Sequence, residues 1–330
     1  MPNRAYLMVA EETLSLLNEN DEWRERYTSY AKEILANIPH IKSVRSSFHE
    51  WSPLYVYMNI SSAKSAKATV NFELRYAGQT VADLIVNEKT GHKLDTKKYA
   101  DKNKRDFGYG VILSGVVWKS EDAKEFRRYF KDERDAGKDL PDKKPNEEHR
   151  LQSLLFTEFS KKRNKVIRHI KPVTIGGVRF PMPTPISASN HKIVKYANYN
   201  GGGIDILTRT GTGGKTHLCI MELKDENERR EPPEDAMKQA VAYTTFVREL
   251  LRSKAGSDWW RLFGFRRDLP RSLQLYSACV MRSNPRYNRP FGDIRLEIDE
   301  DTIELHHFYF EEENDRIKIK QDNTSLKLFD

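Results

Sequence analysis

Apolar residues recur every three or four positions in the first two segments of the chain, Ala5–Asn18 and Asp21–Ile38. This spacing predicts two helices, and the second should end before Pro39 because proline disrupts a helix interior. Runs rich in β-branched and aromatic residues predict strands at Leu54–Ile60, Ala68–Arg75, Thr80–Val86 and Tyr109–Trp118. With a further helix expected at Glu121–Phe130, the first part of the chain is predicted to be an α+β domain.

Two polar stretches interrupt this pattern. Lys89–Arg105 carries six lysines and one arginine against two aspartates, which fits a solvated loop or a loop that follows a phosphate backbone. Residues 134–146 are charged and contain two prolines, so they are predicted to link two domains. We therefore expect an accessory domain at 1–133, for substrate selection, dimerisation or sensing, and a second domain at 147–330.

The second domain alternates helical and strand patterns. A helix is predicted at Glu147–Lys162, with Leu151 and Leu155 on its apolar face and Glu148 on the buried side of its first turn. The other predicted elements are strands at Val166–Ile175, Val178–Pro181, Ile204–Thr208, Thr216–Leu223, Leu273–Met281, Ile294–Ile298, Thr302–Phe310 and Arg316–Lys320, a loop at Met182–Asn200 and a helix at Pro233–Ser253. This order predicts an α/β fold with a mixed sheet flanked by helices.

Three charged residues stand out on two of these strands. Asp205 lies in the first strand, and the second ends with Glu222 and, two positions later, Lys224. Residues two apart in a strand share a face, so Glu222 and Lys224 are predicted to lie side by side, and hairpin pairing can bring Asp205 near Glu222. Two carboxylates on adjacent strands can hold Mg²⁺, while a lysine beside them can orient a water or stabilise a pentavalent phosphate.

The glycine-rich segment Gly211–Thr216 between these strands resembles the end of a phosphate-binding P-loop. That motif requires a glycine where this chain has Arg209, and it requires a helix after the lysine, whereas a strand pattern follows Lys215. The segment is therefore predicted to be a hairpin turn, and no ATP site of the P-loop type is expected there.

Charge and cysteine content place limits on partners and compartment. The 330 residues include 56 basic and 48 acidic ones, giving a net charge of +8, which is compatible with a polyanionic partner. The two cysteines, Cys219 and Cys279, lie in apolar strand patterns and are predicted to be buried free thiols. The chain shows no signal-peptide core and no apolar run of membrane-spanning length, so we expect a soluble, cytoplasmic protein without a membrane partner.

Four features follow one another in the second domain: a helix with an inward glutamate, IDIL at 204–207, CIMELK at 219–224 and KQAVAY at 238–243. In this order they resemble the PD-(D/E)XK nuclease superfamily, over roughly residues 147–280. The resemblance implies a restriction-endonuclease-like αβββαβ core. Ile204 stands where the motif's proline would be, and residues 1–133 have no counterpart that we recognise.

The resemblance also implies site residues and a cofactor. The implied set consists of the metal ligands Asp205, Glu222, Glu148 and the backbone carbonyl of Leu223, the catalytic lysine Lys224, and the supporting glutamine Gln239. Mg²⁺ is the implied cofactor, with Mn²⁺ as a substitute.

The function implied by the resemblance is a metal-dependent deoxyribonuclease that hydrolyses phosphodiester bonds, in particular an endonuclease in restriction, antiphage defence or repair. Two alternatives stay open: a catalytically inactive module with the nuclease fold that binds nucleic acid, and a nuclease specific for RNA. DNA is the expected partner in preference to RNA, and pairing of two copies as a homodimer is left open.

A cluster of aromatic and basic residues follows the long helix. The tryptophans and phenylalanines of Asp258–Arg271 are more often buried anchors than base-stacking platforms. The arginines that could contact phosphates near the strand ends are Arg266, Arg267, Arg271, Arg282, Arg286 and Arg289.

Overall fold

The computed structural model describes most of the chain and divides it into two compact units. The described residues are 2–45, 53–58, 69–87, 91–103, 105–135, 146–160, 169–188, 194–197, 202–211, 213–314 and 316–326. The larger unit comprises Met1–Ala31, Leu154–Val173 and Pro181–Asp330. The smaller unit comprises Lys32–Ser153 and Thr174–Phe180.

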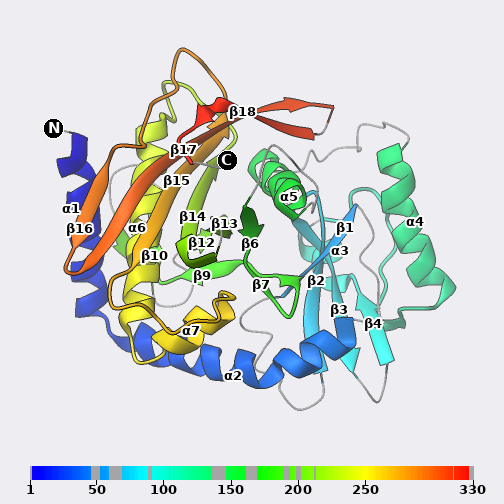
Figure 1. Cartoon of the computed structure of the whole chain (residues 1–330). Helices are drawn as coiled ribbons and strands as arrows, with labels where there is room; N and C mark the ends of the chain where they lie inside the picture. Colours follow the sequence, from blue (N-terminus) through cyan, green and yellow to red (C-terminus); the bar gives the residue numbers. More distant parts are fainter. Residues whose placement is uncertain are drawn as a thin grey trace. The chain divides into compact units, whose positions relative to one another are not determined.

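The larger unit is built on one mixed sheet with the strand order β16-β17-β15-β14-β13-β6, and β18 also pairs with β17 (Figure 1). Its strands are β6 (Ile170–Pro172), β13 (Ile206–Thr210), β14 (His217–Lys224), β15 (Gln274–Arg282), β16 (Arg295–Ile298), β17 (Asp301–Glu313) and β18 (Arg316–Thr324). β15 runs parallel to both β14 and β17, and the other pairings are antiparallel. The predicted α/β class with a mixed sheet is therefore confirmed.

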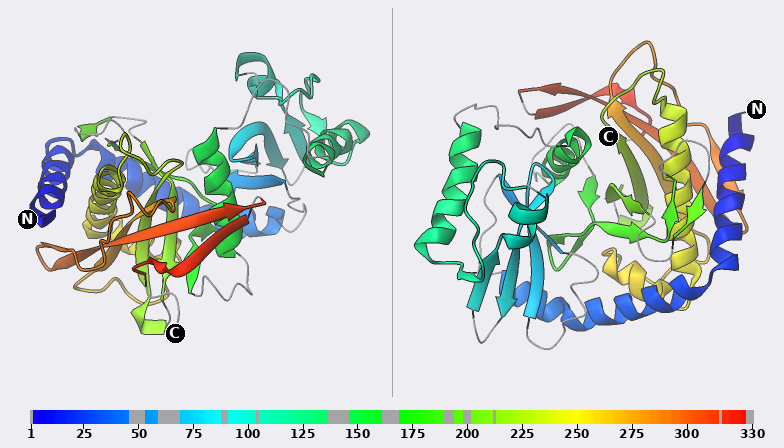
Figure 2. Two further views of the ribbon diagram at one scale, coloured as in Figure 1. Left: turned by 90° about the horizontal axis from the view of Figure 1, so that it is seen from above. Right: turned by 180° about the vertical axis from the view of Figure 1, so that it is seen from behind.

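Helices pack against this sheet and against one another. The larger unit contains α1 (Pro2–Glu19), α6 (Pro233–Arg252), α7 (Gly256–Leu262), the first part of α2 (Glu22–Arg45) and the second part of α5 (Glu147–Ser160). α6 contacts β14, β15 and β17, and α1 lies alongside α6 (Figure 2). Of the helices described, none combines the length and the apolar character needed to cross a membrane.

The division into units differs from the boundaries predicted at residues 133 and 147. α1 and the first part of α2 belong to the larger unit because their aromatic side chains complete its core. Trp23 and Tyr27 lie 5.6 and 5.1 Å from Phe246, and Tyr27 lies 5.9 Å from Trp259, measured between ring centroids. Tyr6 makes a similar contact, at 6.1 Å, with Phe291. Such long-range contacts leave no local signal in the sequence.

The smaller unit holds the second sheet, with the order β5-β4-β3-β2-β1-β8-β7. Its strands are β1 (Leu54–Met58), β2 (Thr69–Tyr76), β3 (Gln79–Asn87), β4 (Gly91–Asp95), β5 (Val116–Val117), β7 (Thr174–Ile175) and β8 (Val178–Arg179). Its own helices are α3 (Lys97–Asn103) and α4 (Glu121–Asp135). β1 to β5 form an antiparallel meander, as the predicted α+β pattern suggested for most of these segments.

The prediction that the second helix ends before Pro39 is wrong, because α2 continues through Pro39 to Arg45. An internal proline removes one hydrogen bond and crowds the preceding turn, at a cost of about 3 kcal/mol. Ile41 is fully buried beyond it, and a Cβ added to Gly176 would lie 2.7 Å from the Cγ2 atom of Ile41. This close apolar packing helps to offset the cost of the proline.

The lysine-rich segment Lys89–Arg105 is not a loop, since β4 and α3 occupy most of it. β4 pairs with β3 through Leu94, which is fully buried. The Tyr99 hydroxyl on α3 donates a hydrogen bond to Asp83 Oδ1 at 2.7 Å. Two well-placed side chains thus order a stretch whose average composition is that of a solvated loop.

Two other predicted segments differ in the structure. Of the strand predicted at Tyr109–Trp118, only β5 pairs with a described neighbour, because Gly110 and Gly115 adopt positive φ values of 70° and 61° that break an extended backbone. The loop predicted at Met182–Asn200 contains the short strands β9 (Met182–Thr184), β10 (Ile186–Ser187) and β11 (Lys195–Tyr196). β9 pairs with β12 (Gly202–Ile204) just before the hairpin.

Cys219 and Cys279 are fully buried and free, as predicted, and burial raises the pKa of both thiols to about 12. We expect a disulfide reagent such as DTNB to react with the native protein at least about a hundredfold more slowly than with the unfolded chain, because thiolate is the reacting species. The measurement is thiol release with and without urea. Rapid release of two equivalents from the native protein would contradict the burial of these thiols.

Candidate metal centre

The β13–β14 hairpin brings the three predicted charged residues to one end of the strands. Its register pairs Ile206 with Met221 and Thr210 with His217, so Asp205 comes opposite Glu222 when the same pairing is extended by one residue. The Oδ2 atom of Asp205 accepts a hydrogen bond from the backbone N–H of Leu223 at 2.9 Å. Oxygen atoms of the Asp205 and Glu222 carboxylates lie within 4.8 Å of one another. The predicted approach of Asp205 to Glu222 is confirmed.

Glu222 and Lys224 lie on the same face of β14, as their spacing predicts. The Nζ atom of Lys224 lies 3.1 Å from Glu222 Oε1, and both residues are less than one-tenth exposed. Burying a carboxylate and an ammonium costs free energy unless both are paired, so this arrangement is costly in a purely structural role. A pair of nearby carboxylates raises the cost further, and a divalent cation would reduce it.

Glu148 stands in the first turn of α5, in the part of that helix that belongs to the smaller unit. Within the larger unit, Asp205 and Glu222 offer carboxylate oxygens that lie within 4.8 Å of each other. Carboxylate oxygen is the ligand type that Mg²⁺ and Mn²⁺ prefer over histidine or thiolate. The donor set therefore fits the predicted cofactor.

The other acidic residues of α5 have different surroundings. Glu147 forms an ion pair with Arg150 at 2.8 Å, which is the usual role of a glutamate in a first helical turn. Glu158, near the end of the helix, is only 7% exposed.

Tyr243 on α6 lies near the two carboxylates, and the sequence analysis did not single it out as a site residue. Its pKa is raised by burial and by the nearby carboxylates of Glu222 and Asp205. A Cβ on Gly202 would lie 2.6 Å from the Tyr243 hydroxyl oxygen, so this glycine leaves room for the hydroxyl. A tyrosine at helical spacing is more often a core residue, and only the tertiary structure shows its polar end beside the carboxylates.

The two remaining predicted site residues lie on the same elements. Leu223 is buried between Glu222 and Lys224 on β14, and its N–H serves the Asp205 carboxylate. Gln239 is buried one turn before Tyr243, and it lines a cavity of about 550 Å³ together with α1 residues such as Val9. Neither its amide nitrogen nor its amide oxygen has a hydrogen-bond partner among the described residues.

The glycine-rich segment between β13 and β14 is a turn, as predicted. Gly211 has a φ of 93°, and an added Cβ would lie 2.2 Å from the carbonyl oxygen of Lys215. A single 3₁₀ turn at Gly213–Lys215 leads directly into β14, so no helix follows the lysine as a P-loop requires.

The six arginines predicted to contact phosphates do not form one rim, because they lie at opposite ends of β15. Arg266, Arg267 and Arg271 precede this strand, and Arg271 pairs with Glu300 at 3.2 Å. Arg282 closes the strand and pairs with Glu312 at 2.7 Å. Beyond it, Arg289 pairs with Glu234 at 3.1 Å, and the Arg286 guanidinium lies 5.5 Å from the Tyr287 ring. The neighbouring Trp259 and Phe263 are buried anchors.

Comparison with known proteins found no family model, no curated protein and no solved structure that matches the chain.

Proposed function

We propose that the protein is a Mg²⁺-dependent nuclease that hydrolyses phosphodiester bonds in DNA. The proposal is carried by one observation: two carboxylates from adjacent strands, Asp205 and Glu222, lie within 4.8 Å, with the Lys224 ammonium 3.1 Å from Glu222. Hard oxygen ligands beside a lysine suit the hydrolysis of a phosphodiester, which needs an activated water and a counter-charge for the developing phosphorane.

The order of elements around the site supports the same proposal. α5, β6, β13, β14, α6 and β15 occur along the chain in the order α-β-β-β-α-β, with β7 to β12 between β6 and β13 and α7 between α6 and β15. β13 pairs with β6 and β14, and β15 is parallel to β14. We propose that these elements form a restriction-endonuclease-like core, to which β9 to β12 are local additions. The expected biological setting is restriction, antiphage defence or repair.

Each side chain has a role in the proposed mechanism. Asp205 and Glu222 would hold the cation, with Glu148 and the Leu223 carbonyl as further ligands. A bound Mg²⁺ supplies Lewis acidity and lowers the pKa of its water. Lys224 orients the attacking water for in-line displacement and places positive charge beside the scissile phosphate. Tyr243, with its raised pKa, stays protonated at neutral pH, and its hydrogen bond to the Ala188 backbone fixes the ring near the two carboxylates.

The experiment that tests this proposal is a cleavage assay on four substrates: plasmid, linear duplex DNA, single-stranded DNA and RNA. We expect the purified protein to cut DNA with Mg²⁺ or Mn²⁺ and not to cut it with EDTA, because the carboxylates act through the cation. Cleavage in EDTA, or failure to cut any substrate with either metal, would refute the proposal. If the protein cuts RNA alone, it is an RNA-specific nuclease. If it binds nucleic acid without cutting any substrate, it is an inactive module with the nuclease fold.

A further inference from the structure

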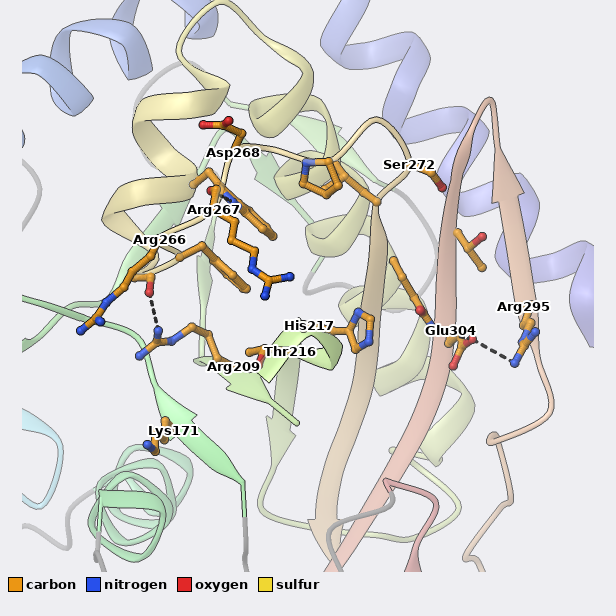
Figure 3. A pocket seen from close by; sticks show the side chains of 18 of the residues that line it. Lys171, Arg209, Thr216, His217, Arg266, Arg267, Asp268, Ser272, Arg295 and Glu304 are labelled. Carbon is orange, nitrogen blue, oxygen red and sulfur yellow. Dashed lines mark hydrogen bonds and ion pairs between the residues drawn. The ribbon is translucent and has the colours of Figure 1, made fainter. Parts of the chain in front are cut away.

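A large cavity opens at the end of the larger sheet where β14, β15 and β17 begin (Figure 3). Its volume is about 1180 Å³, and its walls include these strand ends, β6, β13 and the loop after α7. His217 lies at the cavity, and Glu222 is five residues further along β14, or about 16 Å at the rise of a strand. The cavity is therefore separate from the candidate metal centre.

One half of the cavity is cationic. Four side chains line this half, here termed the cationic end: Lys171, Arg209, Arg266 and Arg267. Figure 3 shows the three arginines and the lysine on the same side, with Asp268 beyond them. Within the described part of the chain, none of the four cations forms an ion pair with a carboxylate. Unpaired guanidinium groups gathered on a concave surface are a characteristic binding site for phosphate.

Arg209 shows most clearly that a counter-charge is missing. Its Nη1 atom donates a hydrogen bond to the carbonyl oxygen of Gly264 at 2.6 Å, which turns the guanidinium along the cavity wall. Its Nε atom is buried and has no hydrogen-bond partner among the described residues. Burial lowers the pKa of this arginine, with no carboxylate to offset the effect. An anion in the cavity would supply the missing partner.

The loop that carries Arg266 and Arg267 is held in one conformation. Gly264 has a φ of 89°, a backbone conformation that favours glycine because other residues are strained there. The Trp260 and Phe265 rings stack at 3.6 Å with 9° between their planes, and Trp260 Nε1 donates to the Arg267 carbonyl at 2.9 Å. A fixed cationic loop loses little entropy when it binds a ligand.

The other half of the cavity has no excess of positive charge: its charged side chains are Arg295, Glu297 and Glu304, beside hydrogen-bonding groups and a ring. Glu304 is paired with Arg295 at 3.1 Å and accepts a hydrogen bond from Gln274 at 2.7 Å. His217 lies between the two halves (Figure 3). Its ring packs 4.9 Å from that of Tyr276, measured between ring centroids. Burial lowers the pKa of His217, so the ring is neutral at pH 7, and a hydrogen bond to the Gln274 backbone engages one of its nitrogens. Such a surface suits a planar heterocycle better than a second phosphate.

We propose that this cavity binds a nucleotide, with its phosphates at the cationic end and its base toward His217 and Glu304. Recognition uses side-chain guanidinium groups and needs no P-loop. Both a free nucleotide and the phosphorylated end of a nucleic-acid strand carry this chemistry. The proposal does not depend on the nuclease activity, because no residue of the cavity belongs to the candidate metal centre.

The test is a binding titration of the full-length protein in EDTA with ATP, AMP, pyrophosphate and a short oligonucleotide with or without a 5′-phosphate. We expect ATP to bind at least about tenfold more tightly than AMP or pyrophosphate, because it reaches both halves of the cavity. Arg267→Ala should weaken ATP binding by about tenfold or more. Arg209→Ala should weaken ATP binding to a similar extent. Because the Arg209 side chain is less exposed than that of Arg267, thermal unfolding is used to check that this variant still folds.

Arg271→Ala is the matched control, since Arg271 is an exposed arginine of the same loop that pairs with Glu300 outside the cavity. It and Asp205→Asn should bind ATP within about twofold of the unchanged protein. Tighter binding of ATP than of either oligonucleotide assigns the site to a free nucleotide. The 5′-phosphorylated oligonucleotide could instead bind more tightly than both ATP and the unphosphorylated oligonucleotide. That result assigns the site to the phosphorylated end of a strand.

Three results would overturn the proposal. The first is that no probe binds at millimolar concentration. The second is that pyrophosphate binds as tightly as ATP, which would mean that the base is not recognised. The third is that Arg271→Ala weakens binding as much as Arg267→Ala, which would indicate attraction by the net charge of the protein and no defined site.

Discussion

Replacing Asp205 with asparagine should reduce metal-dependent DNA cleavage by at least about a hundredfold to a thousandfold. Asparagine keeps the size of the side chain and an oxygen that can accept the Leu223 N–H, so the hairpin should stay intact. What it removes is one negative charge from the pair of carboxylates that would hold the cation. The loss should therefore appear in kcat and in the metal concentration needed for activity, while the unfolding temperature changes little.

Two further variants make this prediction sharper. Lys224→Ala should also abolish cleavage, but it leaves the buried Glu222 without its ion-pair partner and should lower stability as well. Glu226→Gln is the matched control, because Glu226 is an exposed acid just past the end of β14. It should cut DNA like the unchanged protein. Cleavage that survives both Asp205→Asn and Lys224→Ala would place the active site elsewhere.

Replacing Asp301 with asparagine should destabilise the protein by about 3–5 kcal/mol, the largest stability effect expected for a single polar substitution here. Asp301 is fully buried at the start of β17. Its carboxylate accepts hydrogen bonds from Arg248 Nε at 2.7 Å, Arg252 Nε at 2.8 Å and the Leu273 N–H at 2.8 Å. Neutralising it removes the buried charge that both guanidinium groups share, while Arg248 keeps its ion pairs with Asp299 and Glu249. Urea unfolding measures the loss.

Asp299→Asn provides the control for this variant. Asp299 also pairs with Arg248, at 2.6 Å, but its side chain is 75% exposed. An exposed ion pair contributes about 1 kcal/mol or less, so this variant should remain close to the unchanged protein. Equal destabilisation by the two substitutions would show that burial of Asp301 does not set the strength of its contacts.

The effect of Asp301→Asn should depend on pH in one direction. Burial alone would raise the Asp301 pKa, but the hydrogen bonds from Arg252, the Leu273 N–H and Arg248 outweigh burial and lower it. A carboxyl group with a lower pKa in the folded state stabilises the protein fully above its unfolded pKa of about 3.9. That contribution is lost as the pH falls through the folded pKa. The stability difference between the two proteins should therefore be full at pH 7 and should shrink below about pH 4.

The residues of the candidate site were predictable because their signals are local. Alternation in β14 puts Glu222 and Lys224 on one face whatever surrounds the strand, and the length of the turn puts Asp205 opposite Glu222. The same reasoning found α6, β15 and most of the meander to within a few residues, since each is long and strongly patterned.

The errors and omissions arise where distant parts of the chain decide the outcome. Ile41 lets α2 pass through Pro39 because it packs against Gly176, far along the sequence. Leu94 and Tyr99 order the lysine-rich stretch by pairing with β3 and Asp83. No pattern within either segment contains this information, because the stabilising surface belongs to another element.

By itself, the sequence determined the hairpin, the shared face of Glu222 and Lys224, and the mixed α/β class, because these depend on spacing along one or two neighbouring elements. Only the tertiary structure decided that Tyr243 lies near the carboxylates, that the arginines separate to opposite ends of β15, and that Arg266 and Arg267 line a cavity. These outcomes depend on how the sheet, α6 and the loop after α7 pack. Packing joins residues far apart in the chain, and a linear pattern does not record which of them will meet.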